Sequence, residues 1–186
     1  MVRFWGKLGL VLAVASSSLS AQATGPERLE GALLPGYVVG YKAGDQQRSI
    51  REEVPQGETV QRWSRMITTQ RFAGLAARIA PADFARLMIR GVAQSCPGAT
   101  STAPNELTVS GRPAVQVRID CAALPATGKP ETFFLLLVTG EQDLMARQVA
   151  FRSLPTEDDV QWAEAVLSGS VICRGGDMDP PCDRND

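Results

Sequence analysis

The chain has 186 residues, with 19 basic and 20 acidic side chains and no histidine. A net charge of −1 gives no electrostatic case for nucleic-acid binding, because nucleic-acid binders carry a basic excess on one face. The lack of histidine excludes Ser-His-Asp and Cys-His catalysis, because the general base is missing. It also removes the commonest ligand of catalytic zinc. No phosphate loop or dinucleotide fingerprint occurs, so we expect a protein that is not an enzyme and that uses no cofactor or metal.

The first residues have the pattern of a secretory signal peptide. Arg3 and Lys7 precede an apolar run over residues 8–15, and an A-x-A cleavage site ends at Ala23. That run is far shorter than the roughly 20 apolar residues that a membrane-spanning helix needs. We therefore expect residues 1–23 to be removed, and the protein to be periplasmic or secreted.

Two strands are predicted after a polar, turn-like arm at residues 24–35. Residues 36–43 and 46–54 are rich in alternating or β-branched positions, and the Gly-Asp between them suits a hairpin turn. The second strand carries charged residues on both faces. This pattern indicates a solvated edge strand from Arg48 to Glu53.

The run GETVQRWSRMITTQRF follows this hairpin. Val60, Trp63 and Ile67 fall at i, i+3 and i+7, which predicts one face of a helix. Arg62 and Arg65 would then lie on the opposite face. This Arg pair is either a surface for an anion or acidic partner or the solvated face of a packed helix, and packing is the favoured interpretation. For Trp63 we likewise favour packing against the sheet over an exposed binding anchor.

A second helix is predicted from Pro81 to about Gln94, because proline suits the first helical turn and an apolar stripe recurs at helical spacing. From residue 106 to residue 152 the pattern changes to period two and predicts four strands. The third of these, TFFLLLV, is apolar on both faces, as in a covered central strand. Thr156, followed by three acidic residues, predicts the start of a third helix. The order ββααββββα predicts an α+β fold, an antiparallel sheet packed by about three helices, in a single domain over residues 36–173.

The four cysteines all lie beyond the predicted cleavage site. An even number in an exported chain favours two disulfides, and the spacings match no zinc pattern. Four cysteines allow three pairings, among which the sequence alone does not choose. We favour Cys96–Cys121, which would join a helix end to a strand, and Cys173–Cys182, which would close a short loop.

Residues 174–186 predict a polar tail that contains this second disulfide loop. Asp177, Asp179 and Asp183 surround its last cysteine and are a weak candidate for calcium. They lack the glycine and the bidentate glutamate of an EF-hand loop. A polar disulfide loop without a metal is the favoured interpretation.

The element order resembles the PsbP/Mog-type fold, a group that includes extrinsic photosystem subunits, a Ran-binding protein and DcrB-type bacterial envelope proteins. The similarity lies in a strand hairpin leading into PQGETVQRWSRMITTQ and PADFARLMIRGVAQ, and in a strand series ending in FRSLPTEDDVQWAEAVLSGSV. It would cover Leu34 to about Cys173. The paired cysteines and the tail loop depart from the group, and the lack of a lipid-attachment cysteine departs from its DcrB-type members. The resemblance implies a binding or accessory protein, with no site residue carried over.

These observations predict a non-catalytic accessory protein of the bacterial cell envelope that binds a protein partner. The first candidate surface combines Arg62, Arg65 and Trp63 with the predicted edge strand that begins at Arg48. Such an edge can also pair with an extended peptide.

Two other function classes remain open. A small-molecule or lipid-binding periplasmic protein would have a pocket between helices and sheet, lined by Trp63, Phe84 and Phe133. An enzyme would have to use two carboxylates alone, as glycosidases do. We identify no such pair, since Glu52 and Glu53 are adjacent strand residues that point to opposite faces.

Overall fold

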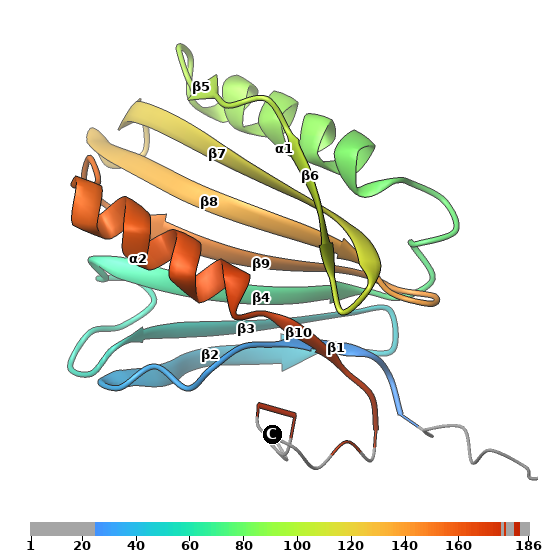
Figure 1. Cartoon of the computed structure of the whole chain (residues 1–186). Coiled ribbons are helices and arrows are strands. Elements are labelled where there is room, and N and C mark those ends of the chain that lie inside the picture. The colour runs from blue at the N-terminus through green and yellow to red at the C-terminus, as the bar shows by residue number, and fades with distance from the viewer. Residues whose placement is uncertain (1–24, 176, 178–180, 183–186) are drawn as a thin grey trace, which may run out of the picture.

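The computed structural model describes residues 25–175, 177 and 181–182, and Figure 1 shows how their elements are arranged. The predicted signal peptide at residues 1–23 lies outside the described residues. No helix within the described ranges is long and apolar enough to span a membrane.

Most of the described chain is antiparallel β-sheet. The strands are β1 (Arg28–Glu30), β2 (Tyr37–Gly44), β3 (Arg48–Pro55), β4 (Arg65–Phe72), β5 (Thr100–Ser101), β6 (Asn105–Val109), β7 (Arg112–Leu124), β8 (Lys129–Thr139), β9 (Leu144–Phe151) and β10 (Val171–Cys173), and the helices are α1 (Pro81–Ser95) and α2 (Glu157–Ser168). The main sheet has the order β2-β3-β4-β9-β8-β7-β5, with β6 also paired to β7. A separate two-stranded sheet joins β1 to β10.

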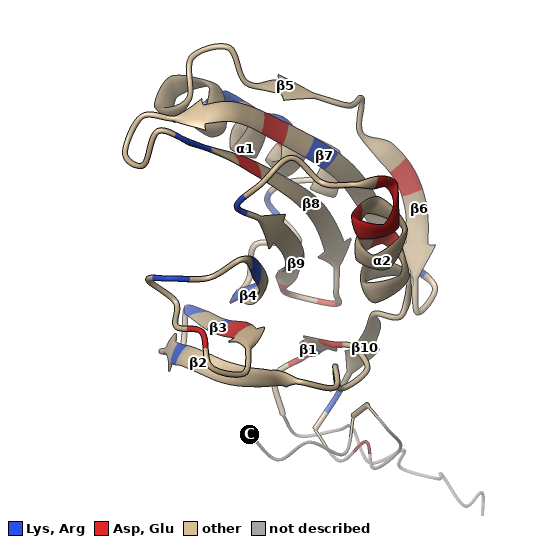
Figure 2. Ribbon diagram, turned by 90° about the vertical axis from the view of Figure 1, so that its left-hand side faces the viewer, with Lys and Arg blue, Asp and Glu red and all other residues tan. Residues whose placement is uncertain are grey.

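The main sheet curves strongly and is covered differently on its two faces. Figure 2 shows it bending around α2 and the β1–β10 pair, which lie on the concave side. The core on that side includes Phe134 and Leu136 of β8 together with residues of α2. The core on the other side packs Leu135 and Leu137 of β8 against residues of α1. The run TFFLLLV is therefore buried on both faces, as its composition predicted.

The prediction of three helices packed on the sheet is wrong. The segment predicted as the first helix supplies β4, and the residues just before it form a loop with one isolated bridge. Three consecutive residues, Met66, Ile67 and Thr68, are buried, because β4 lies between β3 and β9 and alternate side chains enter the two covered faces. The β-branched residues Ile67, Thr68 and Thr69 also favour a strand. The fold remains α+β, with two helices in the described residues.

The start of α2 and both disulfides agree with the sequence analysis. Thr156 caps α2 in a reciprocal hydrogen-bond arrangement with Asp159. Cys96 ends α1 and is bonded to Cys121 in β7. The second disulfide joins Cys173, the last residue of β10, to Cys182. The favoured pairing of the four cysteines is therefore present, and two disulfides are compatible with an exported protein.

Candidate functional site

The outer side of β2 is an uncovered edge of the main sheet. No described strand pairs with it. Three of its apolar side chains, Val38, Val39 and Tyr41, are 44%, 52% and 46% exposed. An edge strand presents a row of unpaired backbone N–H and C=O groups that can pair with another chain. β2 therefore offers both backbone groups and apolar side chains to a partner.

The predicted position of the sheet edge is wrong by one strand. The sequence analysis placed the edge at residues 48–53, which form most of β3. In the structure β3 lies between β2 and β4. Arg51 and Glu53 are buried there, whereas Arg48 at the start of the strand is exposed. The error follows from the missed strand β4, which gives β3 its second neighbour.

A bulge at Gly40 divides β2 into two halves. The pairing with β3 shifts between Val39, which lies opposite Glu53, and Tyr41, which lies opposite Glu52. A Cβ atom at position 40 would approach Val60 Cγ1 to 3.0 Å and Val54 Cγ2 to 3.2 Å, so the bulge fits glycine best. Bulges bend an edge strand and increase its twist.

A cleft of about 990 Å³ lies on the concave side, between β1 and strands β2 to β4. β1 contacts β4 and β9, and the cleft separates it from the second half of β2. Each of four strands contributes one cationic side chain to its lining, and the set is Arg28 of β1, Lys42 of β2, Arg51 of β3 and Arg71 of β4. Two acidic residues, Glu30 and Asp45, also line it. We call this the basic cleft.

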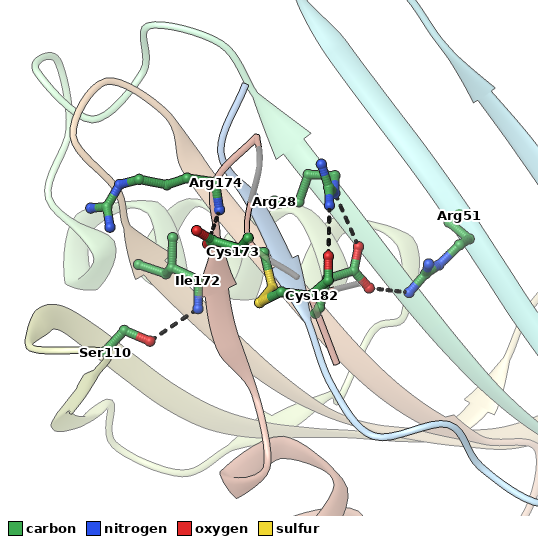
Figure 3. Close-up of a disulfide and its surroundings, with 9 residues drawn as sticks. Arg28, Arg51, Ser110, Ile172, Cys173, Arg174 and Cys182 are labelled. Carbon is green, nitrogen blue, oxygen red and sulfur yellow. Dashed lines mark hydrogen bonds and ion pairs between the residues drawn. A yellow bond between two sulfur atoms is a disulfide. The ribbon is translucent and has the colours of Figure 1, made fainter. Parts of the chain in front are cut away.

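The ion pair between Arg51 of β3 and Glu30 ties β1 to the floor of the basic cleft, and Figure 3 shows Arg51 and Arg28 beside it. Arg51 Nη2 donates to Glu30 Oε2 at 2.8 Å, and Arg28 Nε lies 3.6 Å from Glu30 Oε1. Arg28 Nη2 also donates to the carbonyl oxygen of Cys182 at 3.5 Å. The second disulfide therefore lies at the rim of the basic cleft.

Two further carboxylates near the basic cleft have partners in turns. The Asp45 carboxylate accepts hydrogen bonds from the backbone N–H groups of Arg48 (2.9 Å) and Gln47 (2.8 Å) in the β2–β3 turn. These backbone hydrogen bonds hold the pKa of Asp45 below its usual value. Asp143 accepts from Arg71 Nε at 2.6 Å and from the backbone N–H of Gly74 at 2.9 Å.

The opposite face of β2 borders a smaller, more apolar groove. It has a volume of about 350 Å³ and is lined by residues that include Tyr41, Ile50 and Phe72. Phe72 in turn contacts Phe84 of α1 with ring centroids 5.3 Å apart. The second half of β2 thus runs between this apolar groove and the basic cleft.

The structure does not place the predicted binding residues on one helix face. Arg62 is exposed in the loop before β4. Arg65 begins β4 and is ion-paired with Asp159, and its guanidinium carbon lies 5.2 Å from the Trp162 ring centroid. Trp63 is half-buried, with the Arg152 guanidinium 4.3 Å from its ring centroid. Arg65 therefore joins β4 to α2.

The aromatic residues proposed for a lipid pocket lie around the core beneath α1. Phe133 is buried in it, and Trp63 and Phe84 pack against it. Phe133 lines a recess of about 290 Å³ beside α1, whose lining includes neither Trp63 nor Phe84. The three aromatic residues do not share one pocket.

The proposed calcium ligands fall partly outside the described residues, since Asp179 and Asp183 are not described. Asp177 accepts a hydrogen bond from the backbone N–H of Arg174 at 2.6 Å. Within the described chain, no group of three or more acidic, histidine or cysteine side chains is arranged to hold a metal ion.

No family model matches the chain, and no curated protein matches its sequence. Among solved structures, the protein of unknown function PA94 from Pseudomonas aeruginosa matches with a TM-score of 0.43 and 11% identity, over 80% of this chain and 81% of that one. The Ran-binding protein Mog1p from Saccharomyces cerevisiae matches with a TM-score of 0.46 and 7% identity, over 77% of this chain and 84% of that one. LpqN from Mycobacterium tuberculosis, described as involved in cell envelope biogenesis, matches with a TM-score of 0.41 and 12% identity, over 80% of this chain and 85% of that one. The Mog1p match is consistent with the resemblance to PsbP/Mog-type proteins.

Proposed function

We propose that this protein is an exported, non-catalytic binding protein of the bacterial cell envelope. It holds an extended segment of a partner protein along the outer side of β2. The observation that supports this proposal most directly is the uncovered edge at β2, where three apolar side chains are close to half exposed.

The two edges of the main sheet differ in length and in how they are protected. On the far side, the short strands β5 and β6 both pair with β7 and end the sheet. Natural sheets commonly protect their edges with short strands and charged side chains. β2 is eight residues long, and Lys42 is its single charged residue. An edge of this length and composition fits a strand that is added by a partner.

The surroundings of β2 would give such a strand two different environments. Side chains of an added strand alternate between the two faces of the sheet. On one face they would meet Tyr41 and the apolar groove, and on the other they would meet Lys42 at the basic cleft. Backbone pairing would supply affinity and these two environments would supply selectivity.

Site-specific photocrosslinking in the cell tests this function. A photoreactive residue is placed in turn at position 39, at position 41 and, as the control, at position 87. Leu87 is a matched control, because it is 47% exposed but lies on α1. The proposal expects positions 39 and 41 to crosslink to one segment of a different protein, identified by mass spectrometry, and expects position 87 not to do so.

The partner identified in this way is then used to measure affinity. Tyr41→Lys should weaken binding at least about fivefold, since interface aromatic anchors contribute more than about 1 kcal/mol. Its melting temperature should stay close to that of the parent, because exposed substitutions usually change stability by less than about 0.5 kcal/mol. Leu87→Lys should bind normally. Equal binding by Tyr41→Lys, or crosslinks that lead only to a second copy of this chain, would overturn the proposal.

A further inference from the structure

We infer that the basic cleft binds a small polyanion that carries carboxylate or phosphate groups. This inference rests on the concave face of the sheet and does not depend on whether a peptide pairs with β2. The cleft has a volume of about 990 Å³, at the upper end of the roughly 300–1,000 Å³ that is usual for small-molecule sites.

Two cationic residues lie side by side on the floor of the cleft. Lys42 lies opposite Arg51 and Arg51 lies opposite Thr69, so these three lining residues span three adjacent strands. Like charges directly opposite each other on neighbouring strands are destabilising. Glu30 and Glu53 both lie within ion-pair distance of Arg51 and offset part of this repulsion, and an anion bound beside Lys42 would offset the rest.

The acidic residues of the cleft have partners within the protein. Glu30 is paired with Arg51 and Arg28, and Asp45 accepts two backbone hydrogen bonds in its turn. Arg71 is paired with Asp143, and Glu53 lies 3.8 Å from Arg51 Nη2. Among the described residues, Lys42 is therefore the lining cation that has no ion pair. Arginine side chains suit this ligand class, because the guanidinium matches carboxylate and phosphate oxygens with paired N–H groups.

Thr69 provides a second, independent observation in the same place. Its Oγ1 atom is buried and has no hydrogen-bond partner among the described residues, and Thr69 lines the cleft. Leaving a buried polar group unpaired is unfavourable. If the Thr69 side chain turns toward the cleft, its hydroxyl can donate to an anionic oxygen bound there, which would remove this penalty.

Isothermal titration calorimetry of the full mature protein, with both disulfides formed, tests the inference. The probes are sodium citrate, which carries carboxylates, and sodium pyrophosphate, which carries phosphates. Sodium chloride at equal ionic strength is the salt control. We expect at least one of the two polyanions to bind at one site per chain, with a heat of binding that sodium chloride does not reproduce. The probe that binds more tightly then shows whether the cleft favours carboxylate or phosphate groups.

Matched pairs of variants locate the site. Lys42→Gln should weaken binding about tenfold, as expected for loss of one charge-assisted contact, while Lys129→Gln should not. Both lysines are exposed strand residues. Thr69→Val should weaken binding and leave the melting temperature unchanged or higher, because this hydroxyl makes no hydrogen bond in the described structure. Thr139→Val is its control, since Thr139 Oγ1 is also buried without a described partner and lies outside the cleft lining.

Two results would overturn the inference. One is heat from both polyanions that equals the heat from sodium chloride. The other is unchanged binding in Lys42→Gln and Thr69→Val, which would place the anion elsewhere on the protein.

Discussion

Arg62 and Arg65 are three residues apart, and the structure predicts opposite consequences for replacing them with alanine. Arg65 is ion-paired with Asp159 of α2, and its guanidinium lies over the rings of Phe151 and Trp162. The Arg62 side chain is exposed, and its backbone N–H donates to the Thr59 carbonyl at 2.9 Å, a bond that alanine would keep. Arg65→Ala should therefore lower stability, and Arg62→Ala should not.

The expected size of the effect follows from the contacts of Arg65. A hydrogen bond to a charged group contributes about 1.5–3 kcal/mol, and a cation over an exposed aromatic ring contributes about 0.5–1 kcal/mol. The Arg65 side chain is 42% exposed, so solvent screens the ion pair. We therefore expect a loss of about 2 kcal/mol in the free energy of unfolding. For a domain of this size, that loss lowers the melting temperature by about 4–8 °C.

Thermal and urea unfolding, followed by circular dichroism at neutral pH and low salt, measures both variants against the parent protein. Arg62→Ala should have the same melting temperature and urea midpoint as the parent protein, since substitutions of exposed residues usually change the free energy of unfolding by less than about 0.5 kcal/mol. If Arg65→Ala also unfolds with the parent, the contacts with α2 contribute nothing to stability. Arg65 would then have to be considered again as a binding residue.

Two further predictions concern the start of α2 and the crossing of β1 over the sheet. The backbone N–H of Thr156 donates a hydrogen bond to Asp159 and is the main reason that the pKa of Asp159 lies below its usual value. The Thr156 side chain lowers this pKa further. A group whose pKa is lower in the folded state than in the unfolded state stabilises the protein at higher pH. This stabilisation is lost as the pH falls through the folded-state pKa, so the urea midpoint should decrease when the pH is below about 4. Thr156→Ala should lower stability by about 1 kcal/mol at neutral pH and weaken this pH dependence only in part, because alanine keeps the backbone N–H. Complete loss of the pH dependence in this variant would contradict the assignment. Gly31→Ala should lower stability by about 1–3 kcal/mol, because its Cβ would lie 2.8 Å from the Cζ atom of Arg147, which is 1% exposed. An unchanged urea midpoint for Gly31→Ala would show that the guanidinium can move.

Residues 105–151 were predictable because β6, β7, β8 and β9 each pair with a neighbour in sequence. β7, β8 and β9 follow one another through short turns, and each shows alternation or a long apolar run. β4 was missed because Val60, Trp63 and Ile67 mimic helical spacing. Val60 packs over Gly40 from the preceding loop, and Ile67 belongs to the concave core from within the strand, so the apparent stripe joins two unrelated environments.

The candidate sites were less predictable than the fold, because they depend on pairings between distant segments. The sequence contained the β2–β3 hairpin, but β3 becomes an inner strand only when β4 pairs with it. The basic cleft needs this pairing as well, since Arg51 and Thr69 meet across it. It also needs β1, which comes from the region predicted as a polar, turn-like arm and which pairs with β10 at the other end of the domain.

The buried ions of the concave face explain why β1 has to be held so firmly. Taking an ion out of water costs several kcal/mol, and a buried pair seldom stabilises a protein more than apolar residues of similar size. Arg51 is paired with Glu30 of β1 and lies near Glu53 of its own strand, and the pairing of β1 with β10 helps to hold Glu30 in place. β10 ends at Cys173, whose disulfide partner Cys182 accepts a hydrogen bond from Arg28 of β1. The second disulfide thus stabilises the wall of the basic cleft, whereas Cys96–Cys121 fixes the end of α1 to β7 on the other face of the sheet.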